Sequence, residues 1–196
     1  MAGVRQAKAE ETRARVVATA RKLFAEHGYF STGTTQIVEA AGVGTRGALY
    51  HHFESKDALF LAVFEEIEID LGAKVGVTIT GDTWLERLDQ ATSGFLDASL
   101  EPEVRRVLLI DGPAVLGWDT WREIEARHGL GAFRYMLDEG MKEGSIRAVD
   151  ADTMAHLLLS VVDEAALFIA HAEDPAEARV TAGASVATLV AGLTAL

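Results

Sequence analysis

The sequence contains no cysteine and only three prolines among its 196 residues. Without cysteine the chain cannot form disulfides, thiolate metal sites or a cysteine nucleophile, and this composition fits a reducing cytoplasm. The scarcity of proline and the 49% share of hydrophobic residues favour a packed core over long disordered stretches. We therefore expect a globular protein that is stabilised by packing rather than by covalent or metal cross-links.

Membrane-directing segments are also scarce. The first fifteen residues are polar and charged, and they lack the apolar centre of a signal peptide. One long uncharged segment, residues 180–196 ("VTAGASVATLVAGLTAL"), is short for a membrane span and rich in alanine, glycine and threonine. We interpret this segment as a buried helix with a small-residue packing face, and we expect a cytoplasmic protein.

Positive charge is in short supply, since the formal net charge is −12. The deficit is uneven. Residues 1–60 contain eight Lys/Arg and six Asp/Glu, whereas the remaining residues contain ten and 24. This asymmetry predicts a small head that can approach an anion, carried by a body that repels one. The alternative, that helical surfaces simply vary in charge, stays open at this point.

Helical periodicity dominates the chain, so the fold class that we expect is all-α. Residues 72–83 alternate glycine with β-branched residues, but no partner strand occurs elsewhere, and we interpret them as a loop or frayed helix end at a domain boundary. The helices expected before and after this boundary span residues 11–27, 34–41, 45–53, 55–71, 84–100, 102–118, 119–143, 151–173 and 175–193.

The stretch "GVGTRGALYHHFESKDALF", residues 42–60, begins with a tight glycine-containing turn that joins the short helix over 34–41 to a second short helix over 45–53. At 3.6 residues per turn, the helix over 45–53 has an apolar side with Ala48, Leu49, His52 and Phe53. Its solvent side holds Arg46, Gly47, Tyr50 and His51. A tight glycine turn followed by such a helix is typical of a helix-turn-helix.

This solvent side suits DNA. Arg46 can form two hydrogen bonds to guanine or pair with a phosphate, and Gly47 lets the helix backbone approach closely. Tyr50 and His51 can donate hydrogen bonds to phosphate oxygens. The backbone amides at the starts of the flanking helices also favour phosphate. The residues expected at the DNA interface are Thr34, Thr35, Gln36, Thr45, Arg46, Gly47, Tyr50, His51 and Lys56.

Other chemistries are weakly supported. Adjacent histidines on a helix point about 100° apart, so His51 and His52 cannot chelate one metal ion together. No Gly-x-Ser-x-Gly, His-Glu-x-x-His or phosphate-binding glycine loop occurs. We expect no catalytic site, no cofactor and no metal. Two alternatives stay open: a helical enzyme that carries a similar head, and an adaptor whose head binds another protein.

Residues 11–71 resemble the DNA-binding domain of the tetracycline-repressor (TetR) family. The resemblance is carried by "RVVATARKLFAEHGYFSTGTTQIVEAAGV" followed by "ALYHHFESKDALF". One departure is that the turn "GVGTRGALY" is one residue longer than the common form, with Gly44 in the usual place of a capping serine or threonine. We expect Thr45 to cap the recognition helix instead.

The resemblance implies a ligand-responsive repressor that binds a palindromic DNA operator as a homodimer and is released by a small, mainly apolar molecule. It also implies three parts: a flexible N-terminal arm (1–10), a three-helix helix-turn-helix DNA-binding domain (11–71) and a C-terminal helical ligand-binding and dimerisation domain (72–196). The helix over 56–71 would transmit ligand binding to the head, because it belongs to the head and touches the body.

The residues of the body allow more than one interpretation. Small residues interleaved with Leu, Val and Phe in the last two helices suit close packing between two copies, although a monomer core could use them as well. Aromatic and polar residues predict a pocket, although each aromatic could be ordinary core and Asp163 could bridge subunits. The pocket residues that we expect are Trp84, Phe95, Trp118, Trp121, Phe133, Met136, His156 and Asp163.

Overall fold

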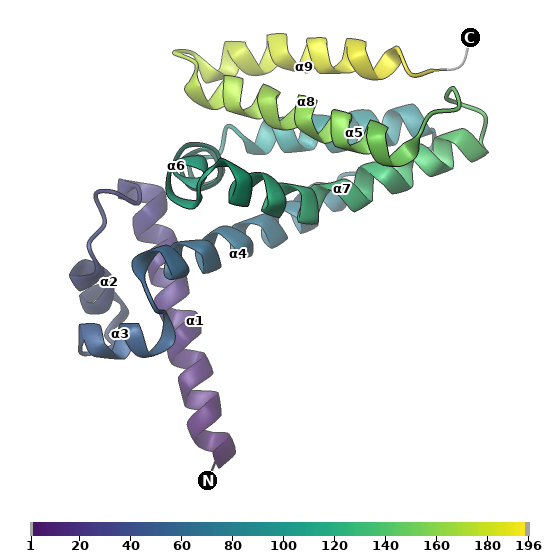
Figure 1. The fold of residues 1–196 in the computed structure, drawn as a ribbon. Helices are drawn as coiled ribbons and strands as arrows, with labels where there is room; N and C mark the ends of the chain where they lie inside the picture. Colours follow the sequence, from purple (N-terminus) through teal and green to yellow (C-terminus); the bar gives the residue numbers. More distant parts are fainter. Residues whose placement is uncertain (1, 195–196) are drawn as a thin grey trace.

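The structure is a computed structural model that describes residues 2–194, and it confirms the all-α prediction (Figure 1). Within the described residues there is no strand, and a single isolated bridge joins Ile146 to Thr194. The helices are α1 (Ala2–His27), α2 (Thr34–Ala41), α3 (Arg46–His52), α4 (Lys56–Gly76), α5 (Trp84–Ala98), the π-helix η1 (Val104–Asp111), α6 (Gly112–Leu116), α7 (Trp118–Lys142), α8 (Ala151–His171) and α9 (Pro175–Ala191).

The first three helices and the start of α4 form a head that projects from one end of the body (Figure 1). Its core is built from side chains at helical spacing that are fully buried, among them Phe24, Ile37, Leu49 and Phe60. Helix α1 begins at Ala2, so it includes residues 2–10, for which the sequence predicts a flexible arm.

Two glycines and one helix cap determine the turn of the helix-turn-helix. Gly42 and Gly44 have φ angles of 63° and 82°, in the left-handed region that glycine adopts without a steric penalty. Thr45 is the N-cap of α3, and its side chain accepts a hydrogen bond from the Ala48 N–H at 3.2 Å, as predicted. The sequence also offers Thr34 or Thr35 as the cap of the preceding helix, but the N-cap of α2 is Gly33, with no side-chain hydrogen bond.

Helix α4 extends beyond the boundary predicted at residues 71–72. It runs to Gly76, and the connecting loop covers residues 77–83 only. Glycine lowers helix propensity, but α4 packs against α5 and α7 in this region, and packing outweighs local preference. The same helix therefore supplies part of the head core and part of the body core.

The body is a stack of long helices in which α8 packs between α7 and α9, and α9 packs on α5 (Figure 1). Two tryptophans are central to it. The Trp84 ring lies against Gly140, which has no side chain to exclude it. Trp121 is fully buried, and its indole N–H donates to the Leu108 carbonyl at 3.0 Å.

Helix α8 is the one described helix that is long and apolar enough to cross a membrane by length and composition. Its mean hydropathy is 1.6, and 44% of the apolar window is buried in the protein. Its packing between two other helices accounts for much of this character. Large apolar side chains on α8 and α9 also face outward: Leu157, Phe168, Val180 and Leu189, each more than half exposed. Leu157 and Phe168 share one side of α8, whereas Val180 and Leu189, nine residues apart, lie on opposite sides of α9. The exposed surface of this helix pair, with Leu157 and Phe168 at its centre, is called the α8/α9 apolar face.

Gly140→Ala is expected to destabilise the body. A Cβ at this position would lie 2.5 Å from Trp84 Cδ1, and the buried ring has no free space to move into. We expect a loss of about 1–3 kcal/mol in the free energy of unfolding, measured by urea denaturation. Gly131→Ala on the same helix is the control, because nothing lies within 4 Å of its Cβ, and we expect it to gain about 0.5–1 kcal/mol. Equal gains in both variants would contradict this packing.

Candidate nucleic-acid interface and buried cavity

Helix α3 has one buried and one exposed side. Leu49 is fully buried and Phe53, directly after the helix, is 5% exposed. The other side is exposed, and Tyr50 alone is 47% exposed. Arg46, Gly47 and His51 are exposed beside it, as is the capping residue Thr45. The helix therefore presents a cation, a phenol and an imidazole to solvent while its apolar side anchors it to the head.

The start of α2 lies beside α3 in the head (Figure 1). Thr35 and Gln36 are exposed, and Thr34 is half-buried. The N-cap makes no side-chain hydrogen bond and the first turn contains no acidic residue. The backbone N–H groups of this turn are therefore free to bind an anion, which the helix dipole also favours.

Lys56, the remaining residue predicted at this interface, has a structural role. Its ammonium donates to the carbonyls of Tyr29 at 2.9 Å and Thr32 at 3.0 Å, and it lies 3.7 Å from the centre of the Tyr29 ring. Burial lowers the pKa of Lys56, and nearby Asp57 acts in the opposite direction. The Tyr29 hydroxyl donates to Asp57. Lys56 therefore ties the α1–α2 connection to α4.

Two polar ties join the head to the body. Arg21 on α1 donates two hydrogen bonds of 2.7 Å to the carboxylate of Glu103, just before η1, and also bonds Glu66 and Asp70 on α4. Asp111, at the end of η1, accepts the Tyr29 N–H at 2.7 Å. The orientation of the head is thus coupled directly to α4 and η1.

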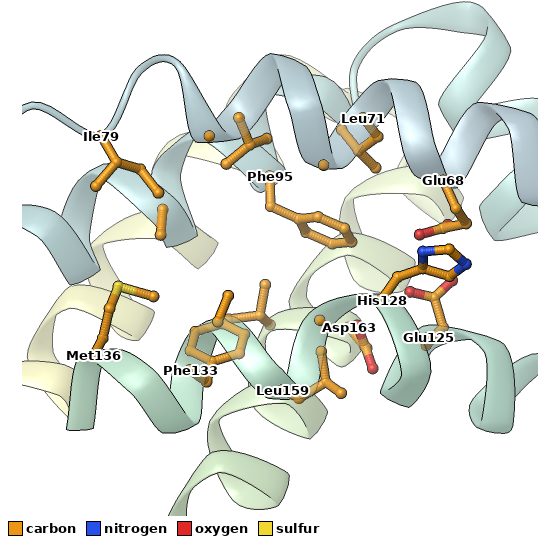
Figure 2. Close-up of a pocket in the computed structure, with 17 residues that line it drawn as sticks. Glu68, Leu71, Ile79, Phe95, Glu125, His128, Phe133, Met136, Leu159 and Asp163 are labelled. Carbon is orange, nitrogen blue, oxygen red and sulfur yellow. The ribbon is translucent and has the colours of Figure 1, made fainter. Parts of the chain in front are cut away.

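The body contains a partly open cavity of about 190 Å³ lined by α4, α5, α7, α8 and the loop after α4 (Figure 2). Ile79 and Met136 lie toward one end, and Phe95, Phe133 and Leu159 form the middle. The other end is polar, with Glu68, Glu125, His128 and Asp163.

Four of the eight predicted pocket residues line this cavity: Phe95, Phe133, Met136 and Asp163. The other four do not. Trp84 and Trp121 belong to the core. The Trp84 ring packs against Gly140, and the Trp121 indole N–H donates to the Leu108 carbonyl. Trp118 is 54% exposed at the start of α7, where its ring packs on Trp121, and His156 is exposed on α8. Asp163 is 2% exposed and pairs with Arg122 of the same chain.

The sequence reasoning missed Glu68, Glu125 and His128. A signal was present, because each buried acid lies four residues after a buried apolar residue: Phe64 before Glu68, Trp121 before Glu125 and Leu159 before Asp163. An acid at a core position of a helix must have a partner or a function. Of these three acids only Asp163, which lies in the most apolar helix, is among the predicted pocket residues.

Burial dominates the electrostatics of the polar end. It raises the pKa of Asp163 to about 7, although the Arg122 guanidinium acts in the opposite direction. It also raises the pKa of Glu68 to about 7 and that of Glu125 well above its ordinary value. A hydrogen bond between these two carboxyls lowers the pKa of Glu68 and raises that of Glu125.

Two buried oxygens at this end have no hydrogen-bond partner among the described residues: Oε1 of Glu68 and Oδ1 of Asp163. Buried acceptors of this kind cost free energy unless something donates to them. No group of three His, Asp or Glu side chains in residues 2–194 is arranged to hold a metal ion.

Two family models match separate parts of the chain. The family model described as "Bacterial regulatory proteins, tetR family" matches residues 16–63, which cover most of the head. The model described as "Tetracyclin repressor-like, C-terminal domain" matches residues 85–193, which cover α5 to α9.

Individual proteins are similar along most or part of the chain. The crystal structure of a TetR-family transcriptional regulator from Pectobacterium atrosepticum superposes with a TM-score of 0.88, is 34% identical and covers 97% of both chains. The TetC protein of transposon Tn10 from Escherichia coli is 25% identical over 143 residues, 73% of this chain and 72% of that protein. The transcriptional regulator AcrR of Shigella flexneri is 35% identical over 116 residues, 56% of this chain and 51% of that protein.

Glu68→Gln is expected to stabilise the protein in a pH-dependent way. The pKa of Glu68 rises from 4.5 to about 7 on folding, so the unfolded chain releases this proton first and the wild-type protein loses stability as pH rises between these values. The glutamine avoids this loss and can keep a hydrogen bond with Glu125. We expect a gain of about 1–3 kcal/mol at about pH 8, which shrinks toward about pH 4.5, in urea denaturation.

Glu65→Gln is the matched control, since Glu65 lies one turn earlier on α4 and pairs with Arg127 at the surface. It should show no such pH-dependent gain. Parallel stability curves for the wild type and Glu68→Gln across this pH range would contradict the buried ionisation of Glu68.

Proposed function

The chain belongs to the tetracycline-repressor family of bacterial transcriptional regulators, and we propose that it represses transcription by binding a palindromic operator as a homodimer until a small, mainly apolar molecule releases it. The proposal places its action in the cytoplasm, where the DNA is. The observation that carries it is the exposed side of α3, with Arg46, Tyr50 and His51 held outward by a buried apolar anchor.

In this proposal α3 enters the major groove. Arg46 reads guanine through its two parallel N–H donors, and Gly47 allows close backbone approach. Tyr50, His51 and Thr45 donate to phosphates and set the register. The amides at the start of α2, with Thr34, Thr35 and Gln36, bind a neighbouring phosphate. Lys56 contributes by holding the head together, because its ammonium is engaged by two carbonyls.

Regulators of this family bind DNA and act as dimers. We assign the dimer contact to the α8/α9 apolar face. Leu157 and Phe168, which share one side of α8, are unfavourable in water, and two copies of the helix pair can bury them in a four-helix bundle. A two-fold dimer would present two α3 helices about 34–36 Å apart, which is one turn of DNA.

Release follows from the position of α4. The helix lines the cavity with Glu68 and Leu71, and it binds Arg21 of α1 through Glu66 and Asp70. A ligand that shifts α4 would change the orientation of the head and thus the spacing of the two α3 helices. A ligand that prefers the shifted form weakens operator binding by the coupling free energy, typically about 1–3 kcal/mol.

The proposal is tested by fluorescence anisotropy of the purified protein with DNA fragments tiled across the region upstream of its own gene. We expect tight binding to one near-palindromic fragment, and a loss of affinity between about 50 and 200 mM salt because phosphate contacts release counterions. Uniform weak binding to every fragment would contradict specific recognition. No salt-dependent binding at all would favour an adaptor or enzyme with a head of similar shape.

Arg46→Ala is expected to weaken operator binding by about tenfold or more, because a two-bond contact to guanine contributes about 1–3 kcal/mol. Tyr50→Phe should cause a smaller loss that is similar for all DNA sequences, since a phosphate contact carries no base information. Both are measured by anisotropy titration. Arg134→Ala, which removes an exposed arginine paired with Asp152 on the body, is the control with the same charge change. Wild-type affinity for Arg46→Ala would contradict the assignment.

Phe168→Glu is expected to convert the dimer into a monomer. Phe168 is 57% exposed on α8, and two glutamates across a two-fold contact would be desolvated and would repel each other. The measurement is light scattering coupled to size exclusion. Tyr135→Glu, which alters a 66% exposed aromatic on α7, is the control and should remain dimeric. Dissociation by both variants, or by neither, would argue against the α8/α9 apolar face as the contact.

A further inference from the structure

The polar end of the cavity has oxygen acceptors that the protein leaves without donors. Glu68 Oε1 and Asp163 Oδ1 have no hydrogen-bond partner in the described residues, and the two side chains are 4% and 2% exposed. Both residues line the cavity (Figure 2). A donor to these oxygens can come from a molecule in the cavity, either water or a ligand.

Negative charge also exceeds positive charge at this end. The facing groups are Glu68 from α4, Glu125 and His128 from α7, and Asp163 from α8, whereas α5 contributes only the apolar Ala91 and Phe95. The nearby cation is Arg122 of α7, which is committed to Asp163 and to the Ser160 hydroxyl at 2.7 Å. Glu68 lies beside the Glu125 carboxyl and forms no ion pair among the described residues.

We propose that the cavity binds a small organic cation, a protonated amine on an apolar body about the size of one ring, with its ammonium at the free oxygens of Glu68 and Asp163. This inference rests on the proposed function, because it names the chemical class of the molecule that releases the operator. The apolar body would lie against Phe95 and Phe133, in the middle of the cavity.

The size of the body follows from the volume. An apolar cavity of about 150 Å³ holds benzene, and drug-sized ligands occupy about 300–1,000 Å³. At about 190 Å³, this cavity has room for one ring and a short amine-bearing chain.

A cation fits the polar end better than a neutral or anionic head group does. An ammonium brings three N–H donors and one positive charge, so it satisfies both free oxygens and offsets the carboxylate charge. An alcohol brings one donor and no charge. A carboxylate would add a fourth acid to the three already buried, and like charges in a low-dielectric site repel strongly.

Binding of a cation should also depend on pH. The pKa values of Glu68 and Asp163 are about 7 in the empty cavity, whereas an alkylamine resembles lysine and stays protonated up to about pH 10. As pH rises through neutrality the acids lose protons and the amine does not. Affinity for the amine should therefore increase by several-fold between about pH 6 and pH 8, as the carboxylates form.

The test compares matched probes on the full-length protein by calorimetry at about pH 8. The first set is 2-phenylethylamine, 2-phenylethanol and phenylacetate. A cyclohexyl set and a hexyl set carry the same three head groups on different apolar bodies. In at least one set we expect the amine to bind about tenfold more tightly than the alcohol, a difference of about 1.4 kcal/mol, with no binding of the carboxylate. If no amine in the three sets binds more tightly than its alcohol, the inference is wrong.

The variant Glu68→Gln tests whether the Glu68 carboxylate causes the preference for the amine. It should reduce the preference for the amine from about tenfold to about threefold or less, while the affinity for the alcohol changes by less than about twofold. Glu65→Gln, outside the cavity on the same helix, should keep the full preference. An undiminished preference in Glu68→Gln would remove Glu68 from the site and overturn the inference.

Operator binding of the ligand-free protein, measured on the same preparation, separates the two proposals. A protein that binds its upstream DNA but shows no preference for amines retains the proposed function and refutes the cation. A protein that prefers amines but binds no DNA refutes the repressor and leaves an amine-binding protein. When both hold, the preferred amine should weaken operator binding in the wild type by about 5–150-fold at saturation, and clearly less in Glu68→Gln.

Discussion

Helix α4 binds Arg21 of the head on one side and lines the cavity on the opposite side, and the rest of the structure depends on this arrangement. Glu66 and Asp70 are one turn apart and bind Arg21 of the head, whereas Glu68 lies about 200° around the helix from Glu66 and faces the cavity. A rigid helix cannot move one side without the other. A shift at Glu68 is therefore transmitted to Arg21 within about one turn, with no extended pathway through the core.

The buried acids of the cavity lower stability in the absence of a ligand. A carboxyl in a low-dielectric site either keeps its proton or loses much of its solvation, and the raised pKa values of Glu68, Glu125 and Asp163 are the expression of that cost. Apolar residues of similar volume would pack there without this penalty. The acids are better understood as a site that is completed by another molecule, whose donors would recover the free energy that the empty cavity forgoes.

The sequence predicted the head better than the cavity, for a physical reason. The two sides of α3 follow from helical period, and Thr45 was recognisable as a cap from its position after a glycine turn. Both are local properties. The cavity depends on which side chains remain uncovered after packing, and that is not local. Trp84 is a reasonable pocket candidate by sequence, but in the fold its ring packs against Gly140, which is 56 residues away. Lys56 is a reasonable phosphate ligand by sequence, but in the fold its ammonium binds two carbonyls of the α1–α2 connection. The length of α4 was missed because tertiary packing carried it through Gly72.

Charge separation along the chain links the two proposals. The body, residues 61–196, contains 14 more acidic than basic residues, whereas the head has a small positive excess. A DNA duplex therefore meets attraction only at the head, which favours the approach that brings α3 to the groove. The same field around the body repels small anions and concentrates small cations near the cavity. An inducer with an ammonium group would thus be attracted by the part of the molecule that repels DNA, and both selectivities would arise from one distribution of charge.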